Sequence, residues 1–395
     1  MGEGRVAIVG GGAAGLVAAI ASARAGARVT LVEAGSRVGQ KILASGNGRC
    51  NLTNTAAAPD AYNAPGFVAP VLDEVSCETV LAFFGDLGLM TYADDEGRVY
   101  PVTNAANSVL DVLRLECAHL GVEERFGYEV ARIERGGGGF IVRSREGEAI
   151  EADAVIVASG GGASVLESLG HAREPLWPAL VPLATDTRAI RGLSGVRVRC
   201  AGRILDAEGS TLATERGELL FRDYGVSGIM ILDLSRVALP GLTLSLDFFP
   251  DTDPAAMERL LAERIERLGW RNAGQFFSGM LHTRIAQAVL RVAEVPLDAP
   301  ATALDAPSLA RPLKDFGLPI TGTGDPAQAQ VTRGGAVLDG FDPTTMESRR
   351  TPGVFAAGEV LDVDGRCGGF NLHWAWASGI VAGRGAAARA AEPAA

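Results

Sequence analysis

The stretch from Val6 to Glu33 constrains the fold more than any other part of the chain. A β-branched run breaks into Gly10, Gly12 and Gly15, a helical stretch of small residues follows, and a second β-branched run ends on Glu33. This order of strand, glycine turn, helix and strand is a βαβ unit. We therefore expect an α/β fold built on a parallel, Rossmann-like sheet.

The glycine spacing also predicts a ligand. Gly10 permits a tight turn, Gly12 lets the backbone approach a pyrophosphate, and Gly15 lets the helix pack close to the strand. The first turn of the helix offers free N–H groups and the positive end of the helix dipole to phosphates. Glu33 stands where a carboxylate accepts hydrogen bonds from ribose hydroxyls and repels a 2′-phosphate. The stretch therefore predicts a site for FAD or NAD rather than NADP.

The same stretch has a second interpretation, because it carries no charge between Val6 and Ala23. Such a segment also fits a signal peptide or a short membrane span. Glycines inside that kind of helix would cost about 1 kcal/mol each relative to alanine, and the signal interpretation leaves their spacing unexplained. No other apolar stretch has the length of a membrane span. We expect a cytoplasmic protein without membrane contact.

Composition narrows the classes of partner. A chain of 395 residues has room for two or three domains. Its net charge of −11 argues against nucleic acid as the main partner, since phosphate binding depends on basic patches. The five cysteines are widely spaced and form no CxxC pair, which argues against disulfides and against a metal site. The oligomeric state is left open.

Hydrophobic spacing gives a coarse element map of the first half of the chain. Apolar residues at helical spacing predict one helix over 73–88 and another over 107–120. Three β-like runs follow at 128–134, 139–145 and 149–157, and the last of them stops abruptly at glycines. A buried strand of a parallel sheet has this appearance.

Changes in pattern then suggest the domain layout. A proline-punctuated crossing ends a first cofactor-domain segment at 1–183. Short strands predict an antiparallel, barrel-like domain over 184–252 and about 315–335, with a helical insertion at 253–314. Residues 336–395 are expected to complete the cofactor domain. Their long terminal helix carries two glycines four residues apart, Gly379 and Gly383, which predict close packing against another backbone.

Residues 35–54 are dense in Gly, Asn and Ser, and we interpret them as a loop or a short broken helix along the cofactor. The alternative is a set of ordinary turn formers. Lys41 lies inside this segment and is one of only two lysines in the chain, the other being Lys314. It is predicted to reach the reactive ring or a phosphate of the cofactor, or a substrate anion, the alternative being a solvated charge.

Three further segments support a family assignment: VGQKILASGNGRCNLTN from Val38, GELLFRDYGVSG from Gly217, and AGEVLDVDGRCGGFNLHWAWASG from Ala357. Together with the glycine turn they resemble the BaiN/RdsA/YhiN-type three-domain bacterial flavoproteins. The resemblance spans essentially the whole chain. It implies noncovalent FAD in a discontinuous, glutathione-reductase-like domain, an inserted β-barrel-like domain and a small helical domain. Family members include an aminoacetone oxidase and a proposed reductase of bile-acid intermediates.

With the family in view, the helix start after Gly368 and Gly369 is expected to stabilise the negative charge of reduced flavin around N1 and the C2 carbonyl. Cys50 is interpreted as a small packed residue rather than a redox thiol. The predicted cofactor-binding residues are Gly10, Gly12, Ala13, Ala14, Gly15, Glu33, Ala34, Gly39, Lys41, Ser45, Gly46, Asn47, Gly48, Val130, Ala158, Ser159, Gly160, Gly358, Glu359, Gly368, Gly369, Asn371 and Leu372.

His373, Tyr224 and Arg49 are the candidate catalytic residues; a structural role is the alternative for His373, and a surface or turn role is the alternative for Arg49. The expected function is that of an FAD-dependent oxidoreductase, in which hydride passes between a small organic substrate and flavin N5. NAD(P)H is a candidate electron donor, and because the sequence has no second nucleotide fingerprint, such a donor would have to bind transiently over the flavin or be absent. A redox sensor without turnover and an RNA-modifying flavoprotein are the alternatives, the latter disfavoured by the acidic charge. Neither the substrate nor the choice between oxidase and reductase follows from the sequence.

Overall fold

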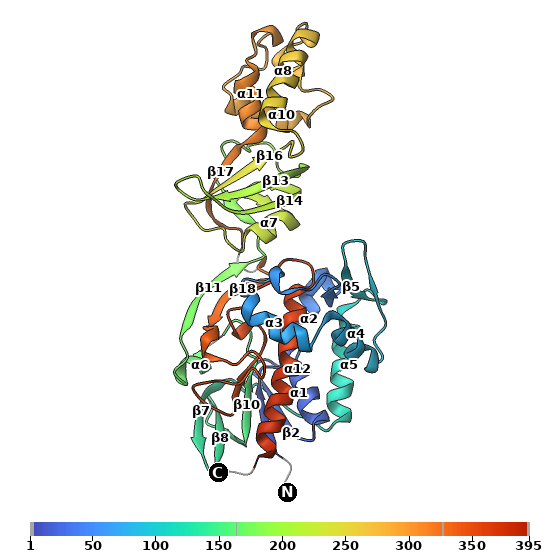
Figure 1. Cartoon of the computed structure of the whole chain (residues 1–395), viewed down its shortest axis with the longest axis vertical. Helices are drawn as coiled ribbons and strands as arrows, with labels where there is room; N and C mark the ends of the chain where they lie inside the picture. The colour runs from blue at the N-terminus through green and yellow to red at the C-terminus, as the bar shows by residue number, and fades with distance from the viewer. Residues whose placement is uncertain (1–3, 163, 326–327, 393–395) are drawn as a thin grey trace. The chain divides into compact units, whose positions relative to one another are not determined.

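The computed structural model describes residues 4–162, 164–325 and 328–392, and the chain forms two compact units (Figure 1). The first unit combines 1–177 with 331–395, and the second is 178–330. Each unit has its own hydrophobic core. None of the described helices combines the length and the apolar character that crossing a membrane requires. The three-domain boundaries expected from the sequence remain a prediction.

A five-stranded parallel sheet forms the centre of the first unit, in the order β19-β10-β1-β2-β6. Its central strands are nearly continuous runs of buried Val, Ile and Ala, as expected for strands covered on both faces. The predicted α/β fold with a Rossmann-like sheet is confirmed. The strands are β1 (Arg5–Val9), β2 (Arg28–Glu33), β6 (Glu123–Phe126), β10 (Ala154–Val157) and β19 (Val354–Ala356).

The C-terminal helix α12 (Phe370–Ala391) packs along α1 (Ala13–Arg24), although the two helices come from opposite ends of the chain (Figure 1). A Cβ placed on Gly379 would lie 2.5 Å from the carbonyl oxygen of Ala14, and one on Gly383 would lie 2.6 Å from that of Ala18. Only glycine permits this approach. The close packing predicted from the two glycines is confirmed.

Two predicted elements of the first unit are wrong in their extent. The helix expected over 73–88 is two helices, because Ser76 starts a new one by accepting a hydrogen bond from the backbone N–H of Thr79. The run at 149–157 is two strands in different sheets, which separate at Asp153, where the carboxylate pairs with Arg5. The other elements of this unit are α2 (Gln40–Ala44), η1 (Ser45–Gly48), β3 (Thr53–Asn54), η2 (Pro59–Ala61), α3 (Pro65–Glu74), α4 (Cys77–Asp86), β4 (Thr91–Ala93), β5 (Arg98–Pro101), α5 (Ala106–His119), β7 (Val130–Gly136), β8 (Gly139–Ser144), β9 (Ala149–Ala152), α6 (Ser164–Ser168), β11 (Arg173–Ala179, which crosses the unit boundary), β18 (Val331–Ala336), η5 (Leu338–Gly340) and η6 (Gly358–Val360).

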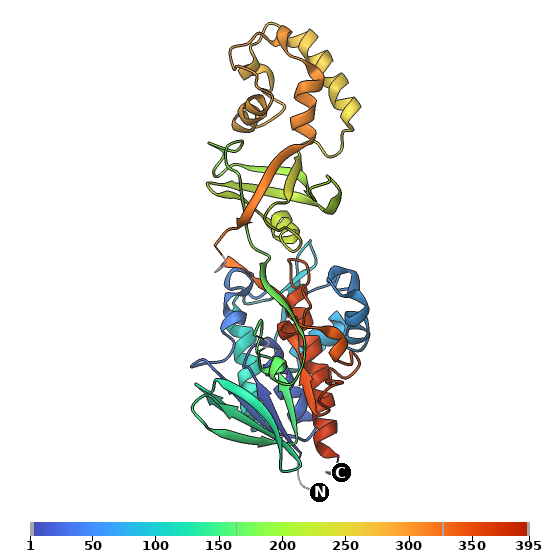
Figure 2. The same ribbon diagram turned by 90° about the vertical axis from the view of Figure 1, so that its left-hand side faces the viewer.

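The second unit contains a closed barrel of antiparallel pairs in the order β12-β15-β14-β13-β16-β17, which confirms the expected barrel-like part. Helices are inserted between β16 and β17, and Figure 2 shows the orange strand β17 running from these helices into the barrel. The elements of this unit are β12 (Leu183–Thr185), β13 (Arg197–Leu205), β14 (Thr211–Arg222), β15 (Gly225–Ser227), α7 (Ile229–Leu234), β16 (Thr243–Asp247), α8 (Pro254–Leu268), α9 (Ala273–Phe276), α10 (Thr283–Val292), η3 (Ala301–Ala303), α11 (Ala306–Lys314) and β17 (Phe316–Thr323).

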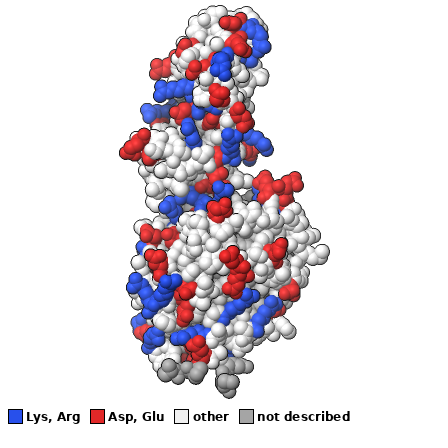
Figure 3. Space-filling view, in the orientation of Figure 1, with Lys and Arg blue, Asp and Glu red and all other residues white. Residues whose placement is uncertain are grey.

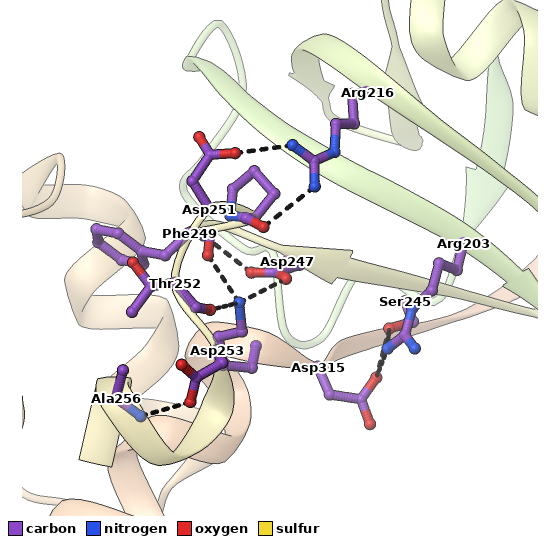
Figure 4. Close-up of polar contacts among 12 residues, drawn as sticks. Arg203, Arg216, Ser245, Asp247, Phe249, Asp251, Thr252, Asp253, Ala256 and Asp315 are labelled. Atoms are coloured by element: carbon purple, nitrogen blue, oxygen red, sulfur yellow. Dashed lines mark hydrogen bonds and ion pairs between the residues drawn. The ribbon is translucent and has the colours of Figure 1, made fainter. Parts of the chain in front are cut away.

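Lys314 fastens the helices of the second unit to its barrel. Its ammonium group lies 2.7 Å from the Asp247 carboxylate at the end of β16, and it donates to the carbonyls of Phe249 and Thr252 on the segment that leads to α8 (Figure 4). Three acceptors on one side chain satisfy all three ammonium protons. The strand end, the connecting segment and the last turn of α11 are therefore held at one point.

Candidate functional site

The carboxyl ends of β1, β2, β10 and β19 meet at one edge of the parallel sheet, where ligands of such sheets bind. The turn after β1 is crowded at two glycines. A Cβ on Gly10, which has φ +107°, would lie 2.4 Å from the Ala158 carbonyl oxygen, and one on Gly15 would lie 1.9 Å from the Gly10 carbonyl oxygen. Gly12 differs, since no atom lies within 4 Å of its Cβ position. Backbone atoms therefore pack closely around Gly10 and Gly15, whereas the space beside Gly12 is open.

The start of α1 is free to receive an anion. Gly12 is its N-cap, no side chain caps the helix, and no acidic residue stands in its first turn. The first N–H groups of a helix have no partner inside the helix. Ala13 and Ala14, both among the predicted cofactor residues, begin this turn and present only methyl groups beside it. The geometry suits a pyrophosphate.

Glu33 is fixed beside the glycine turn. One carboxylate oxygen accepts a 2.8 Å hydrogen bond from the Gly11 N–H, and the other accepts a 2.7 Å bond from the Gly35 N–H. Each carboxylate oxygen retains a lone pair, so the group can still accept from a ribose hydroxyl. Backbone bonds from Gly127 to Gly35 and from Tyr128 to Glu33 attach the segment that leads into Val130.

The 35–54 segment begins as the short helix α2 and continues as the 3₁₀ turn η1. Gly39 joins it to the glycine turn, because its N–H donates to the Gly11 carbonyl at 2.8 Å. Gly46, Asn47 and Gly48 all have left-handed backbone conformations. Ser45 donates its hydroxyl to the Ile42 carbonyl. The segment is thus a broken helix with an irregular, exposed turn.

Lys41 and Glu359 lie together above Gly160, at the ends of β10 and β19. The Lys41 ammonium is 2.7 Å from Glu359 Oε2, and the other Glu359 oxygen accepts from the Thr332 N–H at 2.5 Å. A Cβ on Gly160 would lie 3.5 Å from the Lys41 nitrogen. Gly358 has φ +73° and lies against Ala14 of α1. Residues from distant parts of the sequence therefore gather at this edge, and Ser159 belongs to the same β10 end.

The start of α12 forms the other half of the candidate site. Gly368 and Gly369 have φ of +117° and +101°, and a Cβ on Gly369 would lie 2.4 Å from the Thr53 carbonyl oxygen. Asn371 secures the turn before the helix, since its side chain bonds both the N–H and the carbonyl of Gly365 at 2.8 and 2.9 Å. Leu372 is half-buried against the core.

Two further observations fit a bound cofactor here. Asn51 Oδ1 is buried and receives no hydrogen bond from the described residues. It lies beside the start of α12, 2.8 Å from the Cβ position of Gly369. A buried polar atom without a partner is costly and indicates a ligand or water. No acidic residue occupies the first turn of α12. The residues present therefore fit a bound FAD.

His373 is fully buried, with Nδ1 2.8 Å from the Thr53 hydroxyl oxygen. Burial lowers the pKa of His373 to about 4, because the cation loses its hydration, and the backbone of Val75 offsets only part of this effect. Cys50 is also buried, and burial raises the pKa of its thiol to about 12. Neither side chain is exposed to solvent.

Arg49 and Tyr224 belong to different units. The Arg49 guanidinium carbon lies 4.5 Å from the centre of the Tyr100 ring in the first unit. Tyr224 lies at the turn between β14 and β15 of the second unit and is 38% exposed. Sequence reasoning did not select Tyr100, since nothing local distinguishes it from another strand residue; only its contact with Arg49 does. Among the described residues, no group of three or more His, Cys, Asp or Glu is arranged to hold a metal.

Comparison with known proteins identifies the family of the chain. The family model of the HI0933-like protein Rossmann domain matches residues 4–385. A Clostridium scindens protein named 3-dehydro-bile acid delta(4,6)-reductase is 35% identical over 98% of this chain and 99% of its own. An Escherichia coli protein named ribosomal RNA dihydrouridine synthase is 29% identical over 94% of this chain and 95% of its own.

A solved structure also has this fold. The 3-ketosteroid delta1-dehydrogenase of Sterolibacterium denitrificans aligns with a TM-score of 0.53 at 14% identity, over 97% of this chain and 99% of the other. At that identity the likeness concerns the fold alone. The family match and the full-length relatives carry the assignment. The chain belongs to the HI0933-like Rossmann family and is an FAD-dependent oxidoreductase.

Proposed function

We propose that this protein reduces a carbon–carbon double bond conjugated to a carbonyl group in a small cyclic substrate. The observation that carries the proposal is the 35% identity, over nearly the full length of both chains, to the C. scindens protein named as a bile acid delta(4,6)-reductase. An enone accepts hydride at its β-carbon because the carbonyl takes up the negative charge. Protonation of the α-carbon then gives the saturated product.

The residues of the first unit have distinct tasks in this proposal. Gly12 and the first turn of α1 hold the pyrophosphate, while Glu33 holds the adenosine ribose. The start of α12 after Gly369 places its N–H groups toward the flavin, where they stabilise negative charge. Lys41, neutralised by Glu359 in the free protein, supplies a cation beside Gly160. When bound, FAD supplies the hydride chemistry.

The electron donor is proposed to be NADH or NADPH, which leaves after each transfer. The chain has one nucleotide fingerprint, at the glycine turn after β1. The nicotinamide donor and the substrate would therefore bind alternately on the same side of the flavin. A redox sensor without turnover would bind FAD and fail to reduce any enone.

An anaerobic reduction screen tests this function. Purified holoprotein is mixed with NADH or NADPH and flavin bleaching is followed; enones, amines and hydroxy acids are then added separately. We expect a nicotinamide to bleach the flavin and an enone to restore it, with a reduced product by mass spectrometry. Bleaching by an amine, with recovery in air, would instead indicate an oxidase. The Gly15→Ala variant serves as a control without cofactor, because the added Cβ would overlap the Gly10 carbonyl.

Uridine in RNA is a second candidate substrate. The E. coli relative, 29% identical, is named ribosomal RNA dihydrouridine synthase, and the uracil double bond is likewise conjugated to a carbonyl. Against it stands the net charge of −11, and acidic and basic side chains are intermingled on the face in Figure 3. Conversion of uridine in ribosomal RNA, with no turnover of free enones, would favour RNA.

A further inference from the structure

Arg49 has an unusual setting beside the candidate flavin site. Its side chain is exposed, yet its guanidinium carbon lies over the ring of Tyr100, 4.5 Å from the ring centre, and Tyr100 is only 4% exposed. Among the described residues, none forms a hydrogen bond or an ion pair with the Arg49 guanidinium. A cation–π contact of this kind places the positive charge over the ring and satisfies none of the guanidinium N–H donors with an oxygen acceptor.

The neighbouring cation is already neutralised. Arg98 stands two residues before Tyr100 on β5 and pairs with Asp94 at 2.8 Å and with Glu96 at 2.9 Å. Arg98 on β5 and Arg49 after η1 therefore have different surroundings. Arg98 completes a structural network, whereas Arg49 presents a positive charge that the described carboxylates leave unmatched.

Contacts within the first unit define the surroundings of Arg49. Arg98 and Tyr100 point to the same face of β5, because side chains alternate along a strand. On that face the Arg98 side chain lies 3.7 Å from the Cβ position of Gly368, at the start of α12. Asn51, two residues after Arg49, lies against Gly369. Arg49 and Tyr100 thus border the end of the site assigned to the flavin.

We propose that Arg49 binds a carboxylate group of the substrate, and that Tyr100 is a positioning residue that holds the guanidinium for this contact. The inference rests on the proposed function, which it extends from an enone to an enone that carries a carboxylate. A guanidinium offers two parallel N–H donors that match the two oxygens of a carboxylate. In a chain of net charge −11 an anionic substrate needs such a local cation.

The test compares an acid with its neutral counterpart. The probes are a 3-oxo-4,6-diene bile acid and its primary amide, and the proteins are wild type, Arg49→Gln, Arg49→Lys and the control Arg132→Gln. Arg132 is an exposed arginine of β7 paired with Glu134. We expect Arg49→Gln to raise KM for the acid about 10- to 100-fold, with KM for the amide and kcat within about threefold. Arg49→Lys should fall between, and Arg132→Gln should match wild type.

A second readout does not depend on turnover. Equilibrium dialysis measures binding of the acid and the amide to each oxidised holoprotein, and the flavin-to-protein ratio is recorded for each variant. Wild type should bind the acid more tightly than the amide, and Arg49→Gln should remove that preference while retaining flavin. Equal affinity of wild type for acid and amide overturns the inference. Loss of flavin from Arg49→Gln also overturns it, because Arg49 would then bind the cofactor.

Tyr100 is tested by two substitutions. Tyr100→Phe keeps the ring and should retain the acid preference, whereas Tyr100→Leu should raise KM for the acid alone and leave kcat unchanged. A parallel loss for acid and amide in Tyr100→Leu would indicate a merely structural ring. Failure of the proposed function is distinguishable, because holoprotein could then prefer the acid in dialysis and yet reduce neither probe.

Discussion

The side chain of Lys314 is only 11% exposed, and its ammonium group is surrounded by one carboxylate and two carbonyl oxygens (Figure 4). At this site a lysine and an arginine are not equivalent. A compact ammonium directs three protons to three separate acceptors, whereas a guanidinium is planar and larger. In a chain whose cationic side chains are arginines apart from Lys41 and Lys314, this geometry explains a lysine at position 314.

Lys314→Met should therefore destabilise the second unit by about 3 kcal/mol, because it leaves the largely buried Asp247 carboxylate without its counterion. Chemical denaturation followed by circular dichroism measures the loss. The matched control is Arg216→Gln, which removes an exposed ion pair with Asp251 and should cost less than about 1 kcal/mol. Similar losses in both variants would contradict this role of Lys314.

His373 makes stability depend on pH. Its pKa is lowered by burial from an ordinary 6.5 to about 4. Between these values the unfolded chain binds a proton that the folded chain does not, so stability falls as pH falls through this window. Below pH 4 the loss of stability due to His373 reaches about 3 kcal/mol relative to neutral pH.

Denaturation at pH 7 and pH 4.5 should show this loss in wild type, and His373→Asn should show a smaller one. The exposed His119 supplies the control, since His119→Gln should keep the wild-type dependence. An undiminished loss in His373→Asn would assign the acid sensitivity to other groups. His171 is one such group, since burial and nearby Arg350 also lower its pKa.

At the scale of elements, the contact between α1 and α12 joins the two ends of the chain. Gly379 and Gly383 let the two backbones touch, and the Ser22 hydroxyl donates to the Gly383 carbonyl at 3.0 Å. In the proposed function, the start of α1 and the start of α12 both bind the cofactor. Their spacing therefore depends on the residues along the contact, several turns away from the ligand.

Gly379→Ala should reduce stability by about 1–3 kcal/mol through overpacking, and should weaken FAD retention by changing the spacing of the two helix starts. Thermal unfolding and the flavin content after dialysis measure these effects. Gly85→Ala is the matched control: it lies in α4, no atom is within 4 Å of its Cβ position, and alanine favours helix. Retention of flavin by a destabilised Gly379→Ala protein would separate packing from cofactor binding.

Local patterns predicted much of the architecture, because the βαβ unit, the barrel strands and the terminal helix each carry their signal within a short window. Errors arose where one residue ended an element, as at Ser76 and Asp153. The contacts within the candidate site could not be predicted from the sequence for another reason. Lys41 and Glu359 stand 318 positions apart, and Arg49 meets Tyr100 through a strand pairing that no local pattern specifies.

At the scale of the whole molecule, the chain leaves the first unit after Trp177 and returns to it at Val331. Every predicted cofactor-binding residue lies in the first unit, and of the candidate catalytic residues only Tyr224 lies in the second. Within the first unit, the Cβ position of Gly334 on β18 lies 2.2 Å from the Pro175 carbonyl oxygen on β11. The two crossing segments are thus close enough for a short linker.

A protein in which a short Gly-Ser linker replaces residues 178–330 should therefore fold and bind FAD. Circular dichroism reports the fold, and the flavin absorbance of the dialysed protein reports the cofactor. The same deletion with Gly15→Ala should fold without flavin. A folded deletion protein that binds no FAD would mean that the second unit contributes essential cofactor contacts.

Lys41 and Lys314 also differ in the solvent exposure of their side chains. Lys41 has 71% of its side chain exposed and Lys314 has 11%. Apart from the chain's N-terminal amine, an amine-directed reagent consequently finds one accessible target, and that target lies above Gly160. A fluorophore coupled there would report on this edge of the sheet, and loss of labelling on addition of FAD would measure cofactor occupancy without any turnover.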